Sequence, residues 1–318
     1  MRIRFQEIAV TVLSLMLLAA GGCQWFRPSP KIPEEIRGAE GAEPVLKLYL
    51  HQTGETTELP IERYIAGVVA AEMDPDWPLE ALAAQAMLAR SFTLQKIEEK
   101  GGVPERNAHA SSDIKEFQAY DSSRINQKVL QAVEKTRGEV YVYRGEFIRG
   151  WFHAYAGPKT ALADEGLEFE GKNPPYIQIV SSPGGKIIPE NEGSWTASFP
   201  LVTVQEVVGE LAGEDPGPIT EVKISATGPS GRATRMAFNG LEVPAASLRL
   251  ALGNTEMRST LIDSVQVSGE NLVVSGVGYG HGVGMCQWGA RALAGEGWNG
   301  DKIIDYFFRD VEKVKLWD

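Results

Sequence analysis

A glutamate on an otherwise apolar helical stripe is the first pattern in this sequence that could carry chemistry. The spacing of apolar residues predicts a helix from about Pro60 to Met73, with Glu72 in the middle of its apolar stripe. The stripe consists of Ile61, Tyr64, Ile65 and Val68. Apolar neighbours disfavour the charged form of a carboxyl group, so its pKa rises and it holds a proton near neutral pH. Glu72 is therefore a candidate general acid.

An arginine lies at the corresponding place on the next predicted helix, from about Pro78 to Glu98. Arg90 is at the centre of that helix's apolar face, which consists of Leu79, Leu82, Ala86, Thr93 and Ile97. Buried ions are rarely tolerated without partners. Either Glu72 and Arg90 pair as a structural bridge, or Glu72 is a general acid in a cleft. The spacing alone leaves both interpretations open.

A second candidate site is a glycine-dense loop from Val277 to Gly284 that contains His281. Glycine lets the backbone approach a ligand or another stretch of backbone closely. The loop has neither the spacing of a dinucleotide-binding fingerprint nor the GK[ST] of a phosphate-binding loop. His281 is a candidate acid, base or hydrogen-bond donor, or a loop histidine satisfied by backbone. Cys286 is expected to be a small buried residue at a helix start, because an exposed extracellular thiol oxidises.

The composition excludes several classes of function. The chain has 31 Lys+Arg against 42 Asp+Glu, a net charge of −11, and no basic run, so nucleic acid is not an expected partner. The two cysteines, Cys23 and Cys286, exclude a disulfide scaffold and a four-cysteine zinc site. The four histidines show no HExxH spacing. We expect no cofactor and no metal.

The first residues have the pattern of an export signal. Arg2 and Arg4 precede an apolar run of 13 residues from Ile8 to Ala20, which is too short to span a membrane comfortably. Small residues then lead to Cys23, a pattern that resembles a bacterial lipobox. We expect a lipoprotein signal peptide over 1–22, a lipid-anchored Cys23 and a Pro/Gly-rich tether over 23–44; an uncleaved anchor or plain secretion are the alternatives. The mature protein is expected to work outside the cytoplasm, at the outer face of the cytoplasmic membrane or in secreted form.

The candidate residues must be positioned by a mixed set of helices and strands. The pattern predicts an α+β protein with a single large domain over 45–318. Besides the two helices above, the predicted elements are a strand over 46–50, a helix over 125–136, a hairpin of 139–143 with 146–155, a Pro/Gly-rich stretch over 157–193, short strands and a helix (204–211) within 195–266, a strand over 272–276, two helices and a strand over 314–317.

Two long motifs carry a resemblance to a known family. The first runs from Leu59 to Met73 and continues from Trp77 to Ser91, and the second runs from Gly278 to Ala290. Together with Ser230-Gly-Arg232, Arg249 to Gly253 and Arg258-Ser259, they resemble the stage II sporulation protein D family. The match extends from about Val45 to Asp318. That family includes lytic transglycosylases acting on peptidoglycan glycan strands and relatives described as enhancers of wall amidases.

The resemblance implies roles for individual residues. Glu72 matches the catalytic acid of the family's enzymes. Arg90 is expected to position Glu72 or to bind a lactyl carboxylate, offset from the acid because close pairing would lower the pKa of Glu72. The remaining expected substrate-binding residues are Gln85, His281, Gln287 and Trp288. The implied partners are peptidoglycan glycan strands, other cell-wall hydrolases or engulfment proteins, and the membrane through the lipid anchor.

The chain departs from the family pattern in two places. Residues 109–120 hold one histidine, His109, and no cysteine, so the zinc site of some relatives lacks its ligands. The turn after the predicted hairpin keeps only Gly157 and Thr160 of a family motif. The expected activity is cleavage of the MurNAc-GlcNAc β-1,4 bond with formation of 1,6-anhydroMurNAc ends, in wall remodelling or in septal wall degradation during engulfment. The alternative is a glycan-binding enhancer of a wall amidase that does not cut.

Overall fold

The computed structural model describes residues 30–318. The expected signal segment and Cys23 lie outside the described residues. The expected tether is described from residue 30 onward, and parts of it pack on the rest of the chain. Ile36 is buried in the hydrophobic core, and Glu43 forms an ion pair of 2.5 Å with Arg137. The folded unit therefore begins before Val45, where the sequence pattern placed its start.

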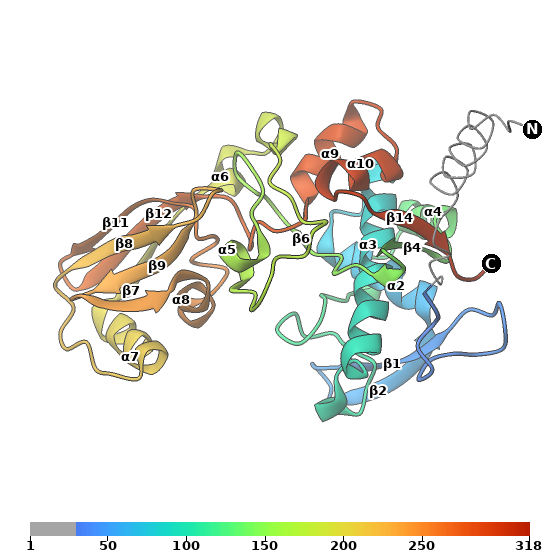
Figure 1. The fold of residues 1–318 in the computed structure, drawn as a ribbon, viewed down its shortest axis with the longest axis horizontal. Helices are drawn as coiled ribbons and strands as arrows, with labels where there is room; N and C mark the ends of the chain where they lie inside the picture. Colours follow the sequence, from blue (N-terminus) through green and yellow to red (C-terminus); the bar gives the residue numbers. More distant parts are fainter. Residues whose placement is uncertain (1–29) are drawn as a thin grey trace, which may run out of the picture.

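The chain forms two lobes, each with its own hydrophobic cluster (Figure 1). The strand-rich lobe comprises residues 194–277, and the helical lobe comprises the described residues before and after it. The chain leaves the helical lobe once and returns to it once. The expected α+β class is confirmed, and the domain contains two separate hydrophobic clusters.

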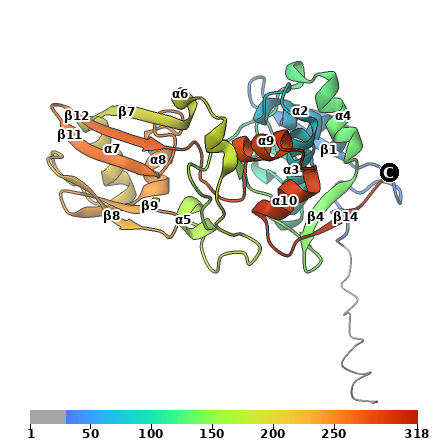
Figure 2. The same ribbon diagram turned by 90° about the horizontal axis from the view of Figure 1, so that it is seen from above.

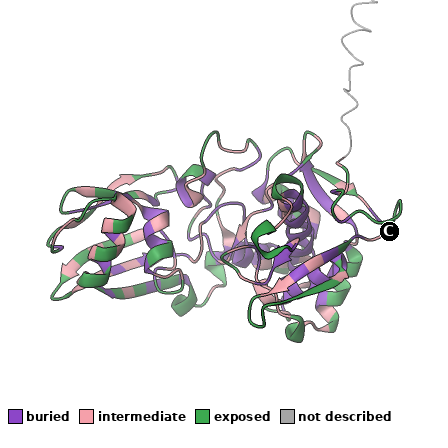
Figure 3. Cartoon of the chain, turned by 90° about the horizontal axis from the view of Figure 1, so that it is seen from below, coloured by how far each residue is buried: buried purple, intermediate pink, exposed green. Residues whose placement is uncertain are grey.

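The helical lobe is built around one long helix, α3 (Leu79–Lys100). The sequence pattern predicted a helix with one apolar face, but α3 is buried on nearly all sides (Figure 3). It contacts α2, α4, β4, α9 and α10. It ends at Gly101, whose φ of +72° provides the left-handed cap that glycine adopts without strain. The surrounding elements are β1 (Val45–Leu50), β2 (Glu55–Pro60), α2 (Ile61–Glu72), β3 (Ala110–Ser111), α4 (Gln127–Lys135) and β4 (Glu139–Tyr143).

The predicted hairpin after α4 is only partly correct. Strand β5 (Glu146–Phe147) pairs with β4, but the chain then leaves that sheet. At Gly150 it passes so close to α3 that a Cβ atom would lie 2.5 Å from the Leu88 carbonyl oxygen. Strand β6 (Phe152–His153) instead pairs in parallel with β13 (Met285–Cys286). The glycine-dense loop is thereby brought next to the middle of the chain.

The connecting stretch and the strand-rich lobe follow. The stretch contains two short helices, α5 (Ala163–Leu167) and α6 (Glu190–Gly193). The lobe has two antiparallel three-stranded sheets, ordered β10-β9-β8 and β11-β12-β7, with α7 and α8 packed against them (Figure 1). Its elements are β7 (Ser194–Pro200), α7 (Leu201–Ala212), β8 (Val222–Thr227), β9 (Ala233–Phe238), β10 (Leu241–Pro244), α8 (Ala245–Leu252), β11 (Ile262–Ser268) and β12 (Asn271–Val277).

The returning chain completes the helical lobe. Helices α9 (Gln287–Gly295) and α10 (Gly300–Phe307) pack against α3, and β14 (Glu312–Lys315) pairs with β4 (Figure 2). Cys286 is buried at the start of α9, and its sulfur accepts a hydrogen bond of 3.3 Å from the backbone N–H of Gly289. Burial raises the pKa of this thiol. The expectation of a small buried residue at a helix start is confirmed.

Candidate functional site

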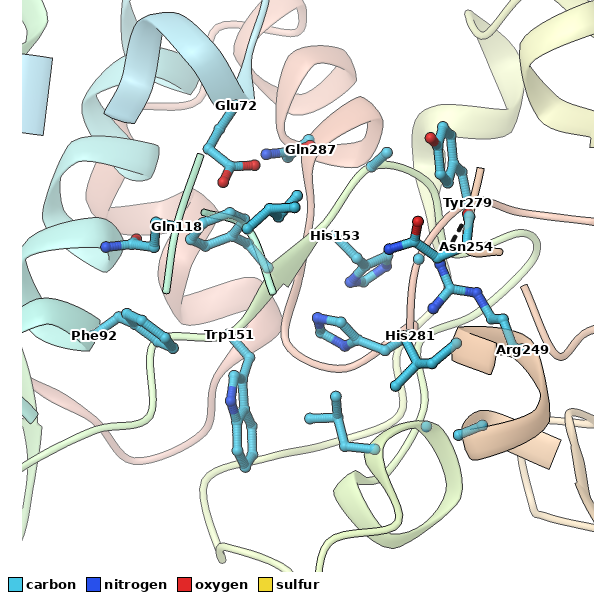
Figure 4. Close-up of a pocket in the computed structure, with 18 of the residues that line it drawn as sticks. Glu72, Phe92, Gln118, Trp151, His153, Arg249, Asn254, Tyr279, His281 and Gln287 are labelled. Carbon is cyan, nitrogen blue, oxygen red and sulfur yellow. Dashed lines mark hydrogen bonds between the residues drawn. The ribbon is translucent and has the colours of Figure 1, made fainter. Parts of the chain in front are cut away.

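A cavity of about 390 Å³ lies where the two lobes meet (Figure 4). Its walls come from the end of α2, the middle of α3, β6, α5, α8 and the glycine-dense loop. The volume falls in the range of small-molecule sites, which are mostly apolar with a few placed polar groups. Three expected site residues, Glu72, His281 and Gln287, line this cavity, and Arg90, Gln85 and Trp288 do not.

Glu72 is the last residue of α2 and stands at one end of the cavity (Figure 4). Burial raises the pKa of its carboxyl group to about 7, while a hydrogen bond from the backbone N–H of Ala119 opposes that rise. The N–H donates to Oε1 at 2.9 Å. Near neutral pH the carboxyl group therefore exists in both protonation states. It can both give and take a proton there.

The position of Ala119 depends on a glycine one and a half turns earlier on α2. At Gly67 an added Cβ would lie 2.2 Å from the Tyr120 ring, so only glycine lets that ring lie against the helix. Tyr120 stacks on Tyr64 with ring centroids 5.8 Å apart, and the Asp121 N–H donates to the Gly67 carbonyl at 3.1 Å. These contacts fix the segment that carries the Ala119 N–H. Gly67 is not among the predicted site residues, although a glycine in a helix interior is itself a signal.

Gln118 is a cavity residue that the sequence analysis missed. Its side chain is buried, and its Nε2 donates to Thr93 Oγ1 at 3.0 Å. Its Oε1 has no hydrogen-bond partner and the residue lines the cavity near Glu72 (Figure 4). A buried acceptor without a partner is costly, and a ligand donor would satisfy it. No motif marks a single glutamine in a loop, so sequence reasoning had no signal for it.

Of the two interpretations left open for Glu72 and Arg90, the structural bridge between them is wrong, because Arg90 pairs with Glu62 and not with Glu72. The guanidinium donates from Nε to Glu62 Oε1 at 3.1 Å and from Nη2 to Oε2 at 2.6 Å, and Nη1 donates to the Glu139 carbonyl at 2.7 Å. Glu62 Oε1 also accepts from the Gly138 N–H and from Trp317 Nε1, each at 3.0 Å. Arg90 is fully enclosed by this network. We therefore correct its expected substrate-binding role to a structural one.

Gln287, the first residue of α9, lines the cavity beside Glu72 (Figure 4). Its Nε2 donates to Gln85 Oε1 at 3.3 Å. Gln85 is fully enclosed on α3, so it can influence a ligand only by holding Gln287. Its expected direct contact with substrate is corrected accordingly.

Trp288 packs away from the cavity. Its ring lies 4.9 Å from that of Trp77, and the Arg291 guanidinium lies within 5.0 Å of both ring centroids. The side chain is almost fully buried in this stack. The expected stacking of a sugar on Trp288 is therefore wrong in this conformation. Trp151 and Phe92, which the sequence analysis did not name, provide aromatic groups at the cavity instead.

His281 lies in the cavity wall as a neutral ring. Its Nδ1 accepts a hydrogen bond of 3.0 Å from the Val283 N–H, which leaves the proton of the neutral ring on Nε2. Burial, and next the nearby Arg249, lower its pKa to about 3. At neutral pH it can donate a hydrogen bond but has no proton to give up as an acid. Of the alternatives left open for His281, a role as general acid is excluded at neutral pH. The ring is a hydrogen-bond donor, and the backbone of its own loop also holds it.

The glycines around His281 are required by backbone geometry. Gly280 and Gly282 have φ values of +103° and +83°. A Cβ on Gly280 would lie 2.8 Å from the Cβ of His153, and one on Gly282 would lie 2.4 Å from the Arg232 guanidinium carbon. The loop therefore packs directly on β6 and on a buried arginine. This close packing explains the glycine density that the sequence showed.

His153, on β6, is a second histidine at the cavity. Its ring lies 5.5 Å from that of His281 in an edge-to-face arrangement. Its Nδ1 donates to the Val283 carbonyl at 3.1 Å, so its Nε2 carries a lone pair, and this buried atom has no partner. Burial, followed by His281 and Arg232, lowers its pKa well below the usual value. A single histidine on a short strand gives no sequence motif.

No group of three or more His, Cys, Asp or Glu side chains within residues 30–318 is arranged to hold a metal ion. His109 Nδ1 accepts from the Lys47 N–H at 3.0 Å. The absence of zinc stays a prediction. Among the same residues no helix has the length and apolar character needed to cross a membrane.

These features define an α+β cleft protein with one acid of near-neutral pKa at the meeting of two lobes. The chain belongs to the stage II sporulation protein D family. A family model described as Stage II sporulation protein matches residues 49–143. Those residues include α2 and α3, and hence Glu72, but not the glycine-dense loop.

Three relatives extend the match beyond that segment. Stage II sporulation protein D of Bacillus amyloliquefaciens is 29% identical over 95% of this chain and 90% of its own length. An uncharacterised protein of Brachyspira hyodysenteriae is 30% identical over 81% of this chain and 67% of its own length. A protein of Bacillus subtilis named Amidase enhancer is 24% identical over 77% of this chain but only 39% of its own length.

Proposed function

We propose that this protein is a peptidoglycan lytic transglycosylase that cleaves the β-1,4 bond between N-acetylmuramic acid and N-acetylglucosamine. The observation that carries the proposal is the state of Glu72, a carboxyl group with a pKa of about 7 at the end of a cavity. A general acid works best when its pKa lies near the operating pH. Hydrolytic glycosidases need a second carboxylate as base or nucleophile. A lytic transglycosylase needs only one.

The single acid performs two proton transfers in this mechanism. Protonated Glu72 gives its proton to the glycosidic oxygen, and the C1–O bond to that leaving oxygen breaks. The resulting Glu72 carboxylate then takes the proton of the muramic acid 6-hydroxyl, whose oxygen bonds to C1 and closes the 1,6-anhydro ring. Glu72 ends protonated, ready for another cycle. No water is consumed, so the products together have the mass of the substrate.

The other carboxylate at the cavity does not suit a nucleophile. Glu168 accepts hydrogen bonds from the Ser247 N–H at 2.7 Å and from Ser247 Oγ at 2.6 Å, in the first turn of α8. Both of its oxygens are engaged in holding that helix. This arrangement supports a mechanism with one carboxyl group.

The remaining cavity groups suit a sugar ligand. Phe92 and Trp151 offer apolar ring faces, on which a sugar ring can stack. Gln118 Oε1 is an acceptor without a partner, whereas the His281 ring already makes a hydrogen bond with the Phe152 backbone. Hydroxyl and acetamido groups present both donors and acceptors. The ring faces, together with a buried acceptor that lacks a partner, support glycan binding in this cavity.

A glycan-binding amidase enhancer is the alternative function. It is supported by the Bacillus subtilis relative named Amidase enhancer and by the altered turn after β6. In that turn Thr160 is fully buried, and its Oγ1 donates to the Gln178 carbonyl at 2.9 Å. Thr160 thus holds the connecting stretch together and offers nothing to a ligand. A protein that binds glycan but leaves it intact would fit this alternative.

One experiment separates the two functions. The purified protein is incubated with peptidoglycan, and the soluble products are examined by mass spectrometry for 1,6-anhydromuramic ends. We expect these ends from the wild type and a loss of at least about 10²-fold in Glu72→Gln, which keeps the side-chain shape but cannot transfer the proton. Full activity in Glu72→Gln would remove Glu72 from the mechanism. Glycan binding without anhydro ends in the wild type would favour the enhancer.

The proposed setting is the cell wall outside the cytoplasmic membrane, with peptidoglycan glycan strands as substrate. Septal wall degradation during sporulation engulfment, other wall hydrolases as partners and a lipid anchor at Cys23 belong to the same proposal. They are supported by the names of the relatives and by the signal-like first residues. Mass spectrometry of Cys23-containing peptides from the native host would detect the acyl chains.

A further inference from the structure

The end of the cavity opposite Glu72 holds a buried cation without a counter-ion. Arg249, on α8, is 8% exposed and lines the cavity across the histidine pair from Glu72 (Figure 4). Its Nε donates to the Arg258 carbonyl at 3.0 Å and its Nη2 to the Asn254 carbonyl at 3.3 Å. Both partners are neutral. No carboxylate within residues 30–318 lies within ion-pair distance of its guanidinium.

The two other buried arginines in the described part of the chain have a carboxylate nearby. Arg90 forms its bidentate pair with Glu62. Arg232 is held close to Glu165, whose charge acts to keep it protonated, and its backbone N–H reaches Glu165 Oε1 at 3.4 Å. An unpaired buried charge is costly, and a bound group of opposite charge would offset that cost. Arg249 differs from the other two in facing a cavity.

The guanidinium is charged and fixed in place. Burial lowers the pKa of Arg249 to about 10, which still leaves it cationic at neutral pH. The Arg258 carbonyl that accepts from Arg249 Nε also accepts from the Gly280 N–H at 2.8 Å. The arginine and the glycine-dense loop thus share one anchor. A side chain that is already held loses little entropy when it binds a ligand.

A second observation at the same place also indicates a ligand. His153 is 4% exposed, lines the cavity, and its Nε2 lone pair has no partner. This atom accepts a hydrogen bond from a hydroxyl or an acetamido N–H. The carboxylate Glu168, which also lines the cavity, is bonded to Ser247 and leaves Arg249 free. The cavity therefore offers one cation and one neutral acceptor away from the acid.

We propose that Arg249 binds a carboxylate of the ligand, while His153 Nε2 accepts a hydrogen bond from a neighbouring sugar hydroxyl or acetamido group. Arginine suits this task because its planar fork matches the two oxygens of a carboxylate. In a peptidoglycan ligand the carboxylate is either the lactyl group of muramic acid or a carboxylate of the stem peptide. The choice of ligand rests on the proposed function, whereas the anion site itself rests on the geometry of Arg249.

Three glycan ligands test the carboxylate by calorimetry. They are a GlcNAc oligomer without carboxylate, a GlcNAc–MurNAc oligomer with free lactyl groups, and the same oligomer whose lactyl groups are amide-linked to stem peptides. All are measured in the Glu72→Gln background, so that cleavage does not interfere. We expect a carboxylate-bearing ligand to bind at least about 10-fold more tightly than the neutral oligomer. Preference for the free lactyl or for the peptide ligand identifies which carboxylate is bound.

Variants test the residue. Arg249→Gln should remove the preference, Arg249→Lys should keep part of it, and the matched control Arg235→Gln should keep it fully. Arg235 is a half-exposed residue on β9 that pairs with Glu242 outside the cavity. Thermal melts establish that each variant is folded. Equal affinity for all three ligands in the folded Glu72→Gln protein with Arg249 intact overturns the proposal, as does an unchanged preference in the folded protein that also carries Arg249→Gln.

A sugar-free probe keeps this test separate from the proposed function. D-Lactate is titrated into the ¹⁵N-labelled protein, and the Arg249 Nε–H signal, assigned by its loss in Arg249→Gln, is followed by NMR. A saturable shift of that signal supports the anion site even if no glycan binds, an outcome that would sink the glycan function alone. Glycan binding without a lactate shift and without ligand preference would leave the function standing and remove the anion site.

Discussion

Glu72 keeps a proton because folding buries its carboxyl group away from water. The ionised form loses its hydration there, so ionisation of Glu72 costs free energy in the folded protein. Its pKa of about 7 lies above its ordinary value of 4.5. Because folding raises the pKa of Glu72, the protonated side chain contributes to the stability of the fold. This contribution is fully present below about pH 4.5 and is lost as the pH rises through about 7. The residue that suits the chemistry best is therefore one that weakens the fold at neutral and alkaline pH.

Glu72→Gln should consequently stabilise the folded protein in a pH-dependent way. The Oε1 of glutamine can still accept from the Ala119 N–H, and it carries no charge at any pH. We expect the melting temperature of the variant to match that of the wild type at pH 4 and to exceed it at pH 8. Thermal melts across that range measure the difference. An equal difference at both ends would mean that Glu72 titrates at its ordinary pKa in the folded protein.

Substitution of His281 should lower both the stability of the fold and the affinity for ligand. A residue with a purely functional role would affect the affinity alone. His281→Ala leaves the Val283 N–H without its acceptor, at a cost of about 1–3 kcal/mol. His281→Asn places an oxygen near the former Nδ1 and should restore much of that stability, but it has no donor at the position of Nε2. Melting temperature and glycan affinity are compared for the two variants. Restored binding in His281→Asn would show that the ring serves the loop alone.

The contact between α2 and the segment 118–121 sets the acid's surroundings, and Gly67 makes that contact possible. Gly67→Ala forces the Tyr120 ring away and withdraws the Ala119 N–H that lowers the pKa of Glu72. We expect a loss of about 1–3 kcal/mol in stability and a rise in the Glu72 pKa. The alkaline limb of the pH–activity profile, where the acid loses its proton, should then move to higher pH.

Gly295→Ala is the matched control for that substitution. Gly295 lies in α9, and an added Cβ would meet nothing within 4 Å. This variant should keep its pH profile and gain a few tenths of a kcal/mol or more, because alanine favours the helix. If Gly67→Ala leaves both stability and the pH profile unchanged, Tyr120 does not control Glu72.

The sequence predicts α2 and α3 closely because each has a long apolar pattern and a proline directly before it. Pro60 and Pro78 precede the first helical residues, Ile61 and Leu79. Helix α8 was not predicted, since eight residues give little periodicity to detect. Strand β6 was assigned to the wrong sheet because its pairing with β13 depends on a segment more than a hundred residues later. Local patterns contain no information about such partners.

The partner of Arg90 shows which features a helical wheel predicts and which it does not. The wheel correctly places Arg90 inward but says nothing about position along the axis. After the short connection, α3 runs antiparallel to α2. Residues that are about equally far from the connection therefore lie next to each other. Arg90 is 11 residues after Leu79 (90 − 79), and Glu62 is 10 before Glu72 (72 − 62). That count was available from the sequence and indicates Glu62, not Glu72, as the partner.

The site as a whole was only partly predictable. Glu72, His281 and Gln287 belong to motifs, and all three line the cavity. Gln118, His153 and Trp151 belong to no recognisable spacing and reach the cavity only through the tertiary fold. Trp288 shares a motif with Gln287, yet the helix directs it into a stack with Trp77. Neighbours in a helical motif face different directions, and the sequence does not say which one faces the ligand.

The overall charge of the molecule opposes the ligand that its cavity suits. The chain carries −11, and muramic acid and stem peptides carry carboxylates. Raising the salt concentration shortens the screening length from about 30 Å at 0.01 M to about 8 Å at 0.15 M. Long-range repulsion is screened strongly, whereas the buried Arg249 contact is screened little. The net charge therefore acts on the rate of encounter more than on the bound complex.

Association with a GlcNAc–MurNAc oligomer should accordingly become faster as salt is added over that range. Stopped-flow tryptophan fluorescence can follow binding, because Trp151 lines the cavity. The uncharged GlcNAc oligomer serves as a control and should show almost no salt dependence. A rate that falls with added salt for the charged oligomer would mean that a local positive field outweighs the net charge.

The network around Glu62 also bears on how the protein is made. Trp317, which donates to Glu62, follows it by 255 residues. At about 5–20 residues per second, a ribosome takes roughly 10–50 s to add that stretch. During that time the carboxylate at the start of α2 has no Trp317 partner, and the β4 edge that β14 covers is open. The first lobe to be synthesised thus cannot close around its central helix until nearly all the remaining residues have emerged, so the nascent chain stays unfinished, and accessible to chaperones, for most of its synthesis.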